Sequence, residues 1–280
     1  MGMRLLHVTV DGDDLPAVMA DNTVYDARGW CSAWSGSEFS SARLTALREA
    51  VSTFPVLDGY DRIGPCVKTP GQILAVGLNY RDHAQESNMK VPSEPVVFTK
   101  SVHSLSGPND DIILPSGARK LDWEVEVGLV IGELVYQASI EAAGKAIAGY
   151  FLANDVSERE WQLEREGQWS KGKSAPSFCP IGPWVVPAPD LPHAQDLHVT
   201  LSVNGMTRQD ARTSSMIFDY AQIVSRLSSY MELHPGDIIL TGTPDGVGLA
   251  TDEYLRAGDR IVLSADGLGE QRALVVDQIR

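Results

Sequence analysis

Two glutamates and one aspartate, each carried on an apolar stretch, constrain this chain more than any other feature. Glu124 and Glu126 lie in Asp122-Trp123-Glu124-Val125-Glu126-Val127-Gly128-Leu129-Val130-Ile131-Gly132, which alternates and then becomes apolar. This pattern predicts a strand that enters a core, and a strand places alternate residues on one face. Asp122, Glu124 and Glu126 are therefore expected to point the same way. Asp155 ends a second apolar run, residues 149–154.

Carboxylates this close repel one another unless a positive charge lies between them, and burying an unpaired charge is costly. Oxygen ligands suit magnesium, calcium or manganese, so a hard divalent cation is the simplest solution. The alternative is a solvated strand edge, where Glu-x-Glu is common. The apolar continuation after Glu126, and the carboxylate that ends the second run, favour a metal site.

Composition narrows the class of protein. The chain has 280 residues, 43% of them hydrophobic and 21% charged, as in a globular protein with a sizeable core. Its net charge of −14 argues against nucleic acid or an anionic membrane as a partner. Cys31, Cys66 and Cys179 form no CxxC pair, which argues against a disulfide framework. With no signal-peptide pattern and no bilayer-length apolar stretch, a cytoplasmic location is expected.

Short apolar runs dominate after residue 70 and do not alternate with long helices. They predict a β-rich α+β fold with mixed sheets rather than a doubly wound parallel sheet. A stretch rich in Pro and Gly, residues 64–71, predicts a boundary between a small N-terminal domain (1–69) and a larger catalytic domain (70–280). Expected strands are 73–77, 96–98, 112–114, 125–131, 184–186, 199–203, 238–240, 261–263 and 274–276.

Three helices are predicted from apolar stripes and caps. One covers residues 41–54, with Ser41 as a possible cap. A second opens at the capping-box pattern Ser157-Glu158-Arg159-Glu160 and runs to about Glu166. A third covers residues 215–230.

Further candidates for chemistry lie outside the acidic residues. His83 and Glu86 would be neighbours on a helical turn, where the carboxylate can hold the imidazole as a general base; a plain surface contact is the alternative. Lys173, in a loop with Gly and Ser, is either solvated or stabilises negative charge. Cys179 is interpreted as a packing residue. Residues 241–248 predict a tight glycine-rich turn whose amides could bind an oxyanion.

Taken in order, these motifs resemble those of the fumarylacetoacetate hydrolase family over residues 70–280. The landmarks are Gly77-x-Asn79-Tyr80-x-x-His83-x-x-Glu86, Gly107-Pro108 with Ile113-Leu114-Pro115, Asp122-x-Glu124-x-Glu126 with Val130-Ile131-Gly132, Asn154-Asp155-Val156-Ser157, Gly172-Lys173-Ser174 before Cys179-Pro180-Ile181-Gly182-Pro183, Val203-Asn204-Gly205, His234-Pro235-Gly236-Asp237, and Thr241-Gly242-Thr243-Pro244-x-Gly246-Val247-Gly248.

The resemblance implies a mixed β-roll catalytic domain, a small N-terminal α/β domain and a homodimer. It implies that Mg²⁺ or Mn²⁺ is bound by Glu124, Glu126 and Asp155. It further implies a catalytic His83–Glu86 dyad on a short lid helix, completed by Lys173, and substrate contacts from Gln162 and Thr243. Larger members carry a fourth carboxylate ligand shortly before the histidine; residues 76–79 contain none, so water is expected in its place.

For the reaction, the resemblance implies a 2-oxo acid substrate. The intact His83–Glu86 pair favours hydrolysis of a carbon–carbon bond in an acylpyruvate or 2,4-diketo acid. Residues 156–173 are similar to a bacterial subgroup labelled ureidoglycolate lyase or diketo-deoxy-sugar-acid hydrolase, which points to a diketo-3-deoxy sugar acid as one substrate class. The same site could instead serve an oxaloacetate decarboxylase, a lyase or a 2-oxo-alkenoate hydratase. A non-catalytic metal-binding scaffold is the alternative from another class.

Overall fold

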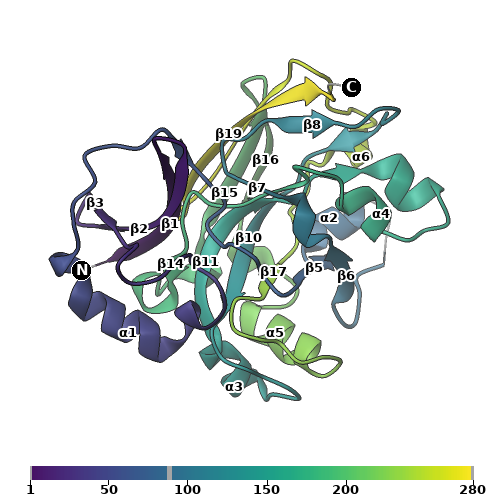
Figure 1. The fold of residues 1–280 in the computed structure, drawn as a ribbon. Helices are drawn as coiled ribbons and strands as arrows, with labels where there is room; N and C mark the ends of the chain where they lie inside the picture. Colours follow the sequence, from purple (N-terminus) through teal and green to yellow (C-terminus); the bar gives the residue numbers. More distant parts are fainter. Residues whose placement is uncertain (1, 87–89, 279–280) are drawn as a thin grey trace.

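The apolar runs of the sequence form a six-stranded mixed sheet at the centre of the molecule, in the order β14-β11-β10-β17-β5-β6. The structure, a computed structural model, describes residues 2–86 and 90–278 (Figure 1). The strands of this sheet are β5 (Ile73–Gly77), β6 (Val96–Lys100), β10 (Val125–Ile131), β11 (Ile147–Asn154), β14 (Val186–Pro187) and β17 (Ile238–Leu240).

Strands β10 and β11 are neighbours inside this sheet and pair antiparallel, with Val125 opposite Asn154. All seven residues of β10 are buried, because the sheet is covered on both faces. Gly128 is required here, since the ring of Phe151 lies 2.2 Å from where a Cβ would stand. This register places the start of β10 beside the end of β11.

A second sheet of five strands packs beside the first, in the order β16-β15-β18-β19-β8. Its strands are β8 (Ile112–Leu114), β15 (His198–Val203), β16 (Met206–Arg212), β18 (Arg260–Ala265) and β19 (Gly269–Asp277). Two short pairs complete the strands of this region: β9 (Leu121–Asp122) with β12 (Ser157–Glu158), and β7 (Leu105–Ser106) with β13 (Cys179–Pro180). Each expected run overlaps a strand, and the strand-rich α+β class is confirmed.

The N-terminal segment forms a separate four-stranded sheet, in the order β3-β2-β1-β4. Figure 1 shows it with α1 on the side of the molecule opposite α2 and α4. Its strands are β1 (Met3–Val10), β2 (Asp13–Ala20), β3 (Thr23–Asp26) and β4 (Arg62–Ile63). Met3, Leu5 and Leu47 share one apolar cluster with Phe151 and Ile238 of the central sheet. The domain division at residue 70 stays a prediction.

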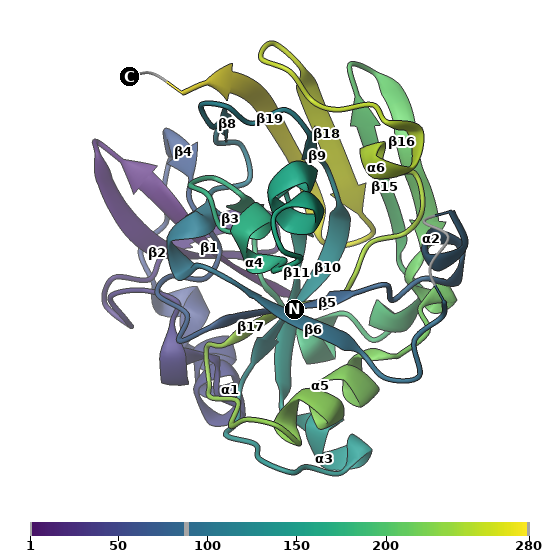
Figure 2. The same ribbon diagram turned by 90° about the vertical axis from the view of Figure 1, so that its right-hand side faces the viewer.

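The helices are short and lie around the sheets, with α3 and α5 together at one end (Figure 2). They are α1 (Ser41–Ala50), α2 (Arg81–Glu86), α3 (Ile140–Lys145), α4 (Ser170–Lys173), α5 (Tyr220–Ser228) and α6 (Gly248–Thr251). Single 3₁₀ turns cover Gly36–Phe39, Val51–Thr53, Val102–Ser104, Ala188–Asp190, Ala194–Asp196 and Thr213–Ser215. Within residues 2–86 and 90–278, no helix has the length and apolar character needed to cross a bilayer.

The predicted boundaries of two helices were wrong. Helix α1 ends at Ala50 and continues only as a 3₁₀ turn over Val51–Thr53, rather than reaching residue 54. Its cap is Ser40 rather than Ser41, because the Ser40 Oγ accepts from the Arg43 amide. Helix α5 begins at Tyr220 rather than at residue 215, because Asp219 and Gln222 form a reciprocal capping box there.

The capping box predicted at Ser157 does not form. Ser157 lies in β12, and its hydroxyl donates to the Asp155 carbonyl at 2.9 Å. A short π-helix follows at Glu160–Glu164, and the Glu158 carboxylate accepts from the Trp161 amide at 2.7 Å. Pairing of Ser157 with Asp122 in the β9–β12 ladder takes precedence over the local helix signal.

Candidate metal centre and catalytic site

Three buried carboxylates meet where β10 begins and β11 ends. Glu124 precedes β10, Glu126 lies within it, and Asp155 follows β11. The Asp155 amide donates to the Glu124 carbonyl at 2.9 Å, which continues the ladder past its last pair. One oxygen from each carboxylate lies within 4.8 Å of the other two. The structure thus brings together the three residues predicted as metal ligands.

Cations lie against two of these carboxylates. The Lys173 ammonium contacts Glu124 Oε2 at 2.7 Å and Asp155 Oδ2 at 2.8 Å. Lys100 pairs with Asp155 Oδ1, and Arg159 pairs with Glu124 Oε1 at 2.7 Å. Lys173 was predicted at the site, whereas Lys100 and Arg159 were missed. Lys100 is the last residue of the apolar strand β6. Asp155 likewise follows an apolar run, so a charged residue at the end of an apolar run is the signal that could have identified Lys100.

Asp122 does not join the cluster of three carboxylates, although it shares the guanidinium of Arg159 with Glu124. Its Oδ2 accepts from Arg159 Nε at 2.7 Å, and its Oδ1 accepts from the Gly248 amide at 2.7 Å. The chain leaves the extended ladder between β9 and β10, so alternation does not carry across that break. Asp122 instead holds the guanidinium of Arg159 in place beside Glu124.

The charges at this site do not balance. Asp122, Glu124, Glu126 and Asp155 face Lys100, Arg159 and Lys173, which leaves one negative charge in excess. Burial disfavours ionisation of Glu124, but Lys173 and Arg159 outweigh it and lower its pKa to about 2.

The excess charge falls on Glu126. Its Oε2 accepts from the Gly242 amide at 2.7 Å, and no ion pair to it is found in the described part of the chain. Burial, together with Asp155 and Glu124, raises the pKa of Glu126 well above its usual range. A divalent cation would remove this repulsion, and an all-oxygen donor set suits a hard cation. The residues present therefore fit a metal ion.

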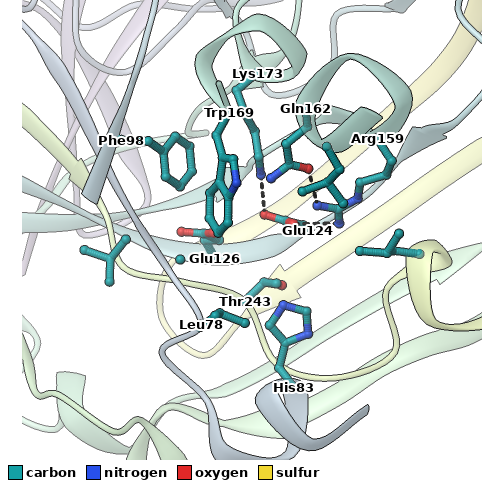
Figure 3. Close-up of a pocket in the computed structure, with 14 residues that line it drawn as sticks. Leu78, His83, Phe98, Glu124, Glu126, Arg159, Gln162, Trp169, Lys173 and Thr243 are labelled. Carbon is teal, nitrogen blue, oxygen red and sulfur yellow. Dashed lines mark hydrogen bonds and ion pairs between the residues drawn. The ribbon is translucent and has the colours of Figure 1, made fainter. Parts of the chain in front are cut away.

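Helix α2 brings His83 and Glu86 together as the sequence predicts. His83 Nδ1 lies 2.9 Å from Glu86 Oε1. The Gly246 amide donates to both oxygens of Glu86 at 3.1 Å, so the glycine-rich turn fixes the carboxylate. With Nδ1–H donating to Glu86, the lone pair that can accept a proton is on Nε2. His83 is buried and lines the same pocket as Glu124 and Glu126 (Figure 3).

Both residues predicted to contact substrate line this pocket. Gln162 Oε1 accepts from Arg159 Nη1 at 2.9 Å, which leaves its amide group for a ligand. The Thr243 hydroxyl donates to the Val125 carbonyl and accepts from Gln209, both at 2.9 Å. Gln162 is thus better prepared than Thr243 to bond a ligand.

Cys179 lies in the core behind the site. It is fully buried, as predicted, and burial raises the pKa of its thiol to about 12. A thiol in this state is a poor nucleophile, because the thiolate is the reactive form.

Comparison with known proteins agrees with this geometry. Residues 72–276 match the model of the fumarylacetoacetate (FAA) hydrolase C-terminal domain. The chain belongs to the fumarylacetoacetate hydrolase family. A Burkholderia multivorans protein, whose name gives the class hydrolase and nothing more, is 45% identical, over 97% of this chain and 98% of its own.

Solved structures of this family share the fold across the whole chain. A fumarylacetoacetate hydrolase from psychrophilic Exiguobacterium antarcticum has a TM-score of 0.85 at 30% identity, over 99% of this chain and 100% of its own. A probable 2-hydroxyhepta-2,4-diene-1,7-dioate isomerase from Mycobacterium abscessus has a TM-score of 0.81 at 33% identity, over 100% of both chains. Because family members are named both hydrolase and isomerase, membership leaves the reaction to be argued from the site.

Proposed function

We propose that this chain is a metal-dependent hydrolase that cleaves a carbon–carbon bond in an acylpyruvate or another 2,4-diketo acid. The observation that carries the proposal is a hydrogen-bonded His83–Glu86 pair in the same pocket as the acidic cluster. Glu124, Glu126 and Asp155 would hold Mg²⁺ or Mn²⁺, which supplies Lewis-acid stabilisation of developing enolate charge when bound.

Charge supports a monoanionic 2-oxo acid as the substrate. The acidic cluster with Asp122 and the cations paired to them, Glu86 beside His83 not counted, leaves one negative charge in excess. A divalent cation would change that excess to one positive charge, which a singly charged 2-oxo acid neutralises. Burial in a low-dielectric pocket makes this matching of charge energetically important.

The chain's own residues would activate water. Glu86 holds the Nδ1–H of His83, and Nε2 removes a proton from a water molecule that attacks the distal carbonyl. The bond between that carbonyl carbon and the neighbouring methylene then breaks, giving a carboxylic acid and the enolate of pyruvate, which takes up a proton. Such a base typically contributes about a hundred- to ten-thousand-fold in rate.

Donors near the acidic cluster would stabilise the negative charge that develops on the leaving fragment. Among residues 2–86 and 90–278, the amide nitrogen of Gln162 has no hydrogen-bond partner, and Lys173 stands at the cluster with its ammonium buried. A positioned donor of this kind is typically worth about 3–4 kcal/mol of barrier.

A second candidate is isomerisation, decarboxylation or lyase chemistry on a 2-oxo acid at this site. The similarity to the Mycobacterium abscessus protein named as an isomerase favours it. These reactions stabilise an enolate but do not all need an activated water. Pyruvate release from a panel of acylpyruvates and oxaloacetate, with and without Mg²⁺, separates hydrolysis from decarboxylation, and a change in the absorbance of a 2-oxo-alkenoate without pyruvate release would indicate isomerisation. Pyruvate from oxaloacetate alone would favour the decarboxylase, and no turnover of any 2-oxo acid would favour a scaffold.

Replacing His83 by alanine tests the dyad. Acylpyruvate hydrolysis should fall at least a hundredfold, while binding of Mn²⁺, measured by calorimetry, should be unchanged because His83 contacts Glu86 rather than the acidic cluster. Normal hydrolysis by this variant would refute the assignment. Glu124→Ala is the matched opposite case, in which both Mn²⁺ binding and activity should be lost.

We also propose that the protein is a homodimer, as its resemblance to the family implies. Light scattering coupled to size-exclusion chromatography tests this directly. A monomer mass of 30.4 kDa at micromolar concentration would refute it.

A further inference from the structure

We propose that the substrate has only one carboxylate and that its distal group is uncharged and largely apolar. This inference rests on the function proposed above and concerns the far end of the same pocket. The apolar residues that line this pocket, called the apolar wall here, are Val76, Leu78, Phe98, Leu163, Trp169 and Leu249. Figure 3 shows Phe98 and Trp169 on one side of the acidic cluster, and Leu78 beside His83.

The permanent cations that line the pocket, within the part of the chain that the structure describes, are Arg159 and Lys173. Arg159 is engaged by Asp122, Glu124 and Gln162. Lys173 is engaged by Glu124 and Asp155. Both therefore belong to the acidic cluster, and neither is free to bind a second carboxylate.

The three residues that follow Glu86 in the sequence add no positive charge to this count. Positions 87–89 are serine, asparagine and methionine, and none of these carries a positive charge. Apart from the acidic cluster and its cations, the titratable residue in the lining of the pocket is His83, which is held by Glu86. A second carboxylate in this pocket would lose its hydration without gaining an ion pair, which is unfavourable.

The aromatic part of the wall is built by close packing. The rings of Phe98 and Trp169 meet edge to face, with centroids 5.4 Å apart. Trp169 also lies against Gly77, where a Cβ would stand 2.4 Å from the indole ring. Any side chain at position 77 would displace Trp169, so the backbone is shaped around this apolar surface.

Leu78 supplies an independent observation. Its φ of 55° lies in the left-handed region, which is unfavourable for a bulky residue and easy for glycine. Its side chain nevertheless lines the pocket. Backbone strain of this kind persists only where the surrounding structure holds the residue in place, and it clusters at ligand sites. An alkyl or aryl distal group gains from contact with this wall, whereas a hydroxylated chain would give up hydrogen bonds to water there.

The test compares two substrates that differ in one group. Butanoylpyruvate (2,4-dioxoheptanoate) and succinylpyruvate (2,4-dioxoheptanedioate) have the same chain, with the terminal methyl of the first replaced by a carboxylate in the second. With Mg²⁺ present, kcat/KM for butanoylpyruvate should exceed that for succinylpyruvate at least a hundredfold. The terminal amide of succinylpyruvate, which is polar but neutral, should lie between them.

A matched pair of variants checks the physical cause. Leu163→Lys places a cation in the wall and should raise the succinylpyruvate to butanoylpyruvate ratio of kcat/KM at least tenfold. Leu163→Met keeps the wall apolar and should leave the ratio unchanged. An unchanged ratio in Leu163→Lys would overturn the assignment of this wall to the distal group.

The outcomes separate the two proposals. Equal or preferred use of succinylpyruvate by the natural protein would overturn this inference and leave diketo-acid hydrolysis standing. Failure to release pyruvate from any of the three compounds would overturn the proposed function, and this inference with it.

Discussion

Replacing Glu126 by glutamine should stabilise the metal-free protein, although it removes a predicted ligand. Glu126 ionises beside Glu124 and Asp155, with oxygens within 4.8 Å. At that distance two like charges repel by about 3.5 kcal/mol if the effective dielectric constant is about 20. Lys100 and Lys173 offset much of this, so we expect a net gain of about 1–3 kcal/mol. Glutamine can keep the bond from Gly242, because its Oε1 also accepts a hydrogen bond.

The gain in stability from Glu126→Gln should increase as the pH rises. The folded pKa of Glu126 is raised above the unfolded value of about 4.5, so the folded protein holds this proton more tightly than the unfolded chain. The natural protein therefore loses stability as pH rises from about 4.5 through the folded pKa of Glu126. The glutamine variant has no such loss. Its advantage should be small near pH 4.5 and should grow toward pH 8.

Urea denaturation in EDTA at pH 5 and pH 8 measures this difference. In thermal melts the glutamine variant should have the higher Tm, by roughly 2 °C for each kcal/mol of added stability in a chain of this size. Adding Mg²⁺ at about 100 times its dissociation constant should raise the stability of the natural protein by about 2.7 kcal/mol and that of the variant by much less.

Glu141→Gln is a suitable control, because Glu141 pairs with Lys145 on the surface. Its removal should change stability by no more than about 0.5 kcal/mol. A Glu126→Gln protein that is equal to or less stable than the natural one, in EDTA at pH 8, would refute the reasoning from excess buried charge.

Two further predictions concern the support of the site. Lys100→Met should destabilise the protein by about 3–5 kcal/mol, because Asp155 would lose one of its two cationic partners in a fully buried ion pair and keep only Lys173; a loss under 1 kcal/mol in urea denaturation would contradict the pairing. Gly128→Ala should cost about 1–3 kcal/mol, because its Cβ would meet the Phe151 ring. The double variant Gly128→Ala/Phe151→Leu should recover part of that loss, and no recovery would show that the ring is not the obstacle.

Much of the fold was predictable because the relevant signals are local. Runs of apolar residues marked the strands, and Ile73–Gly77, Ile112–Leu114 and Ile238–Leu240 have the expected bounds. Helix ends were less predictable. At Ser157 the sequence offers a good capping box, but a strand partner competes for the same residue and prevails. A local pattern cannot show that such a partner exists.

The residues of the site were also predictable only where the signal was local. His83 and Glu86 were found from their spacing alone, because one helical turn places residues three apart in contact. The contact between Glu86 and the Gly246 amide joins residues 160 positions apart, and no spacing rule predicts it. At Asp122 a local pattern was misleading. Its alternation with Glu124 suggested that both bind the metal, but the extended ladder is broken between β9 and β10, so the alternation does not hold there.

The sequence by itself determined which residues can carry the chemistry: acidic side chains on apolar strands, a histidine with a carboxylate one turn away, and a glycine-rich turn. These are properties of neighbouring residues, where backbone geometry alone sets the contact. Only the tertiary structure decided how the charges pair. Lys100, Arg159 and Lys173 reach the carboxylates from separate segments, and the register of β10 against β11 determines which oxygens they meet. A one-residue shift of that register would turn Glu126 to the other face of the sheet, so the charge balance is a property of the assembled sheet.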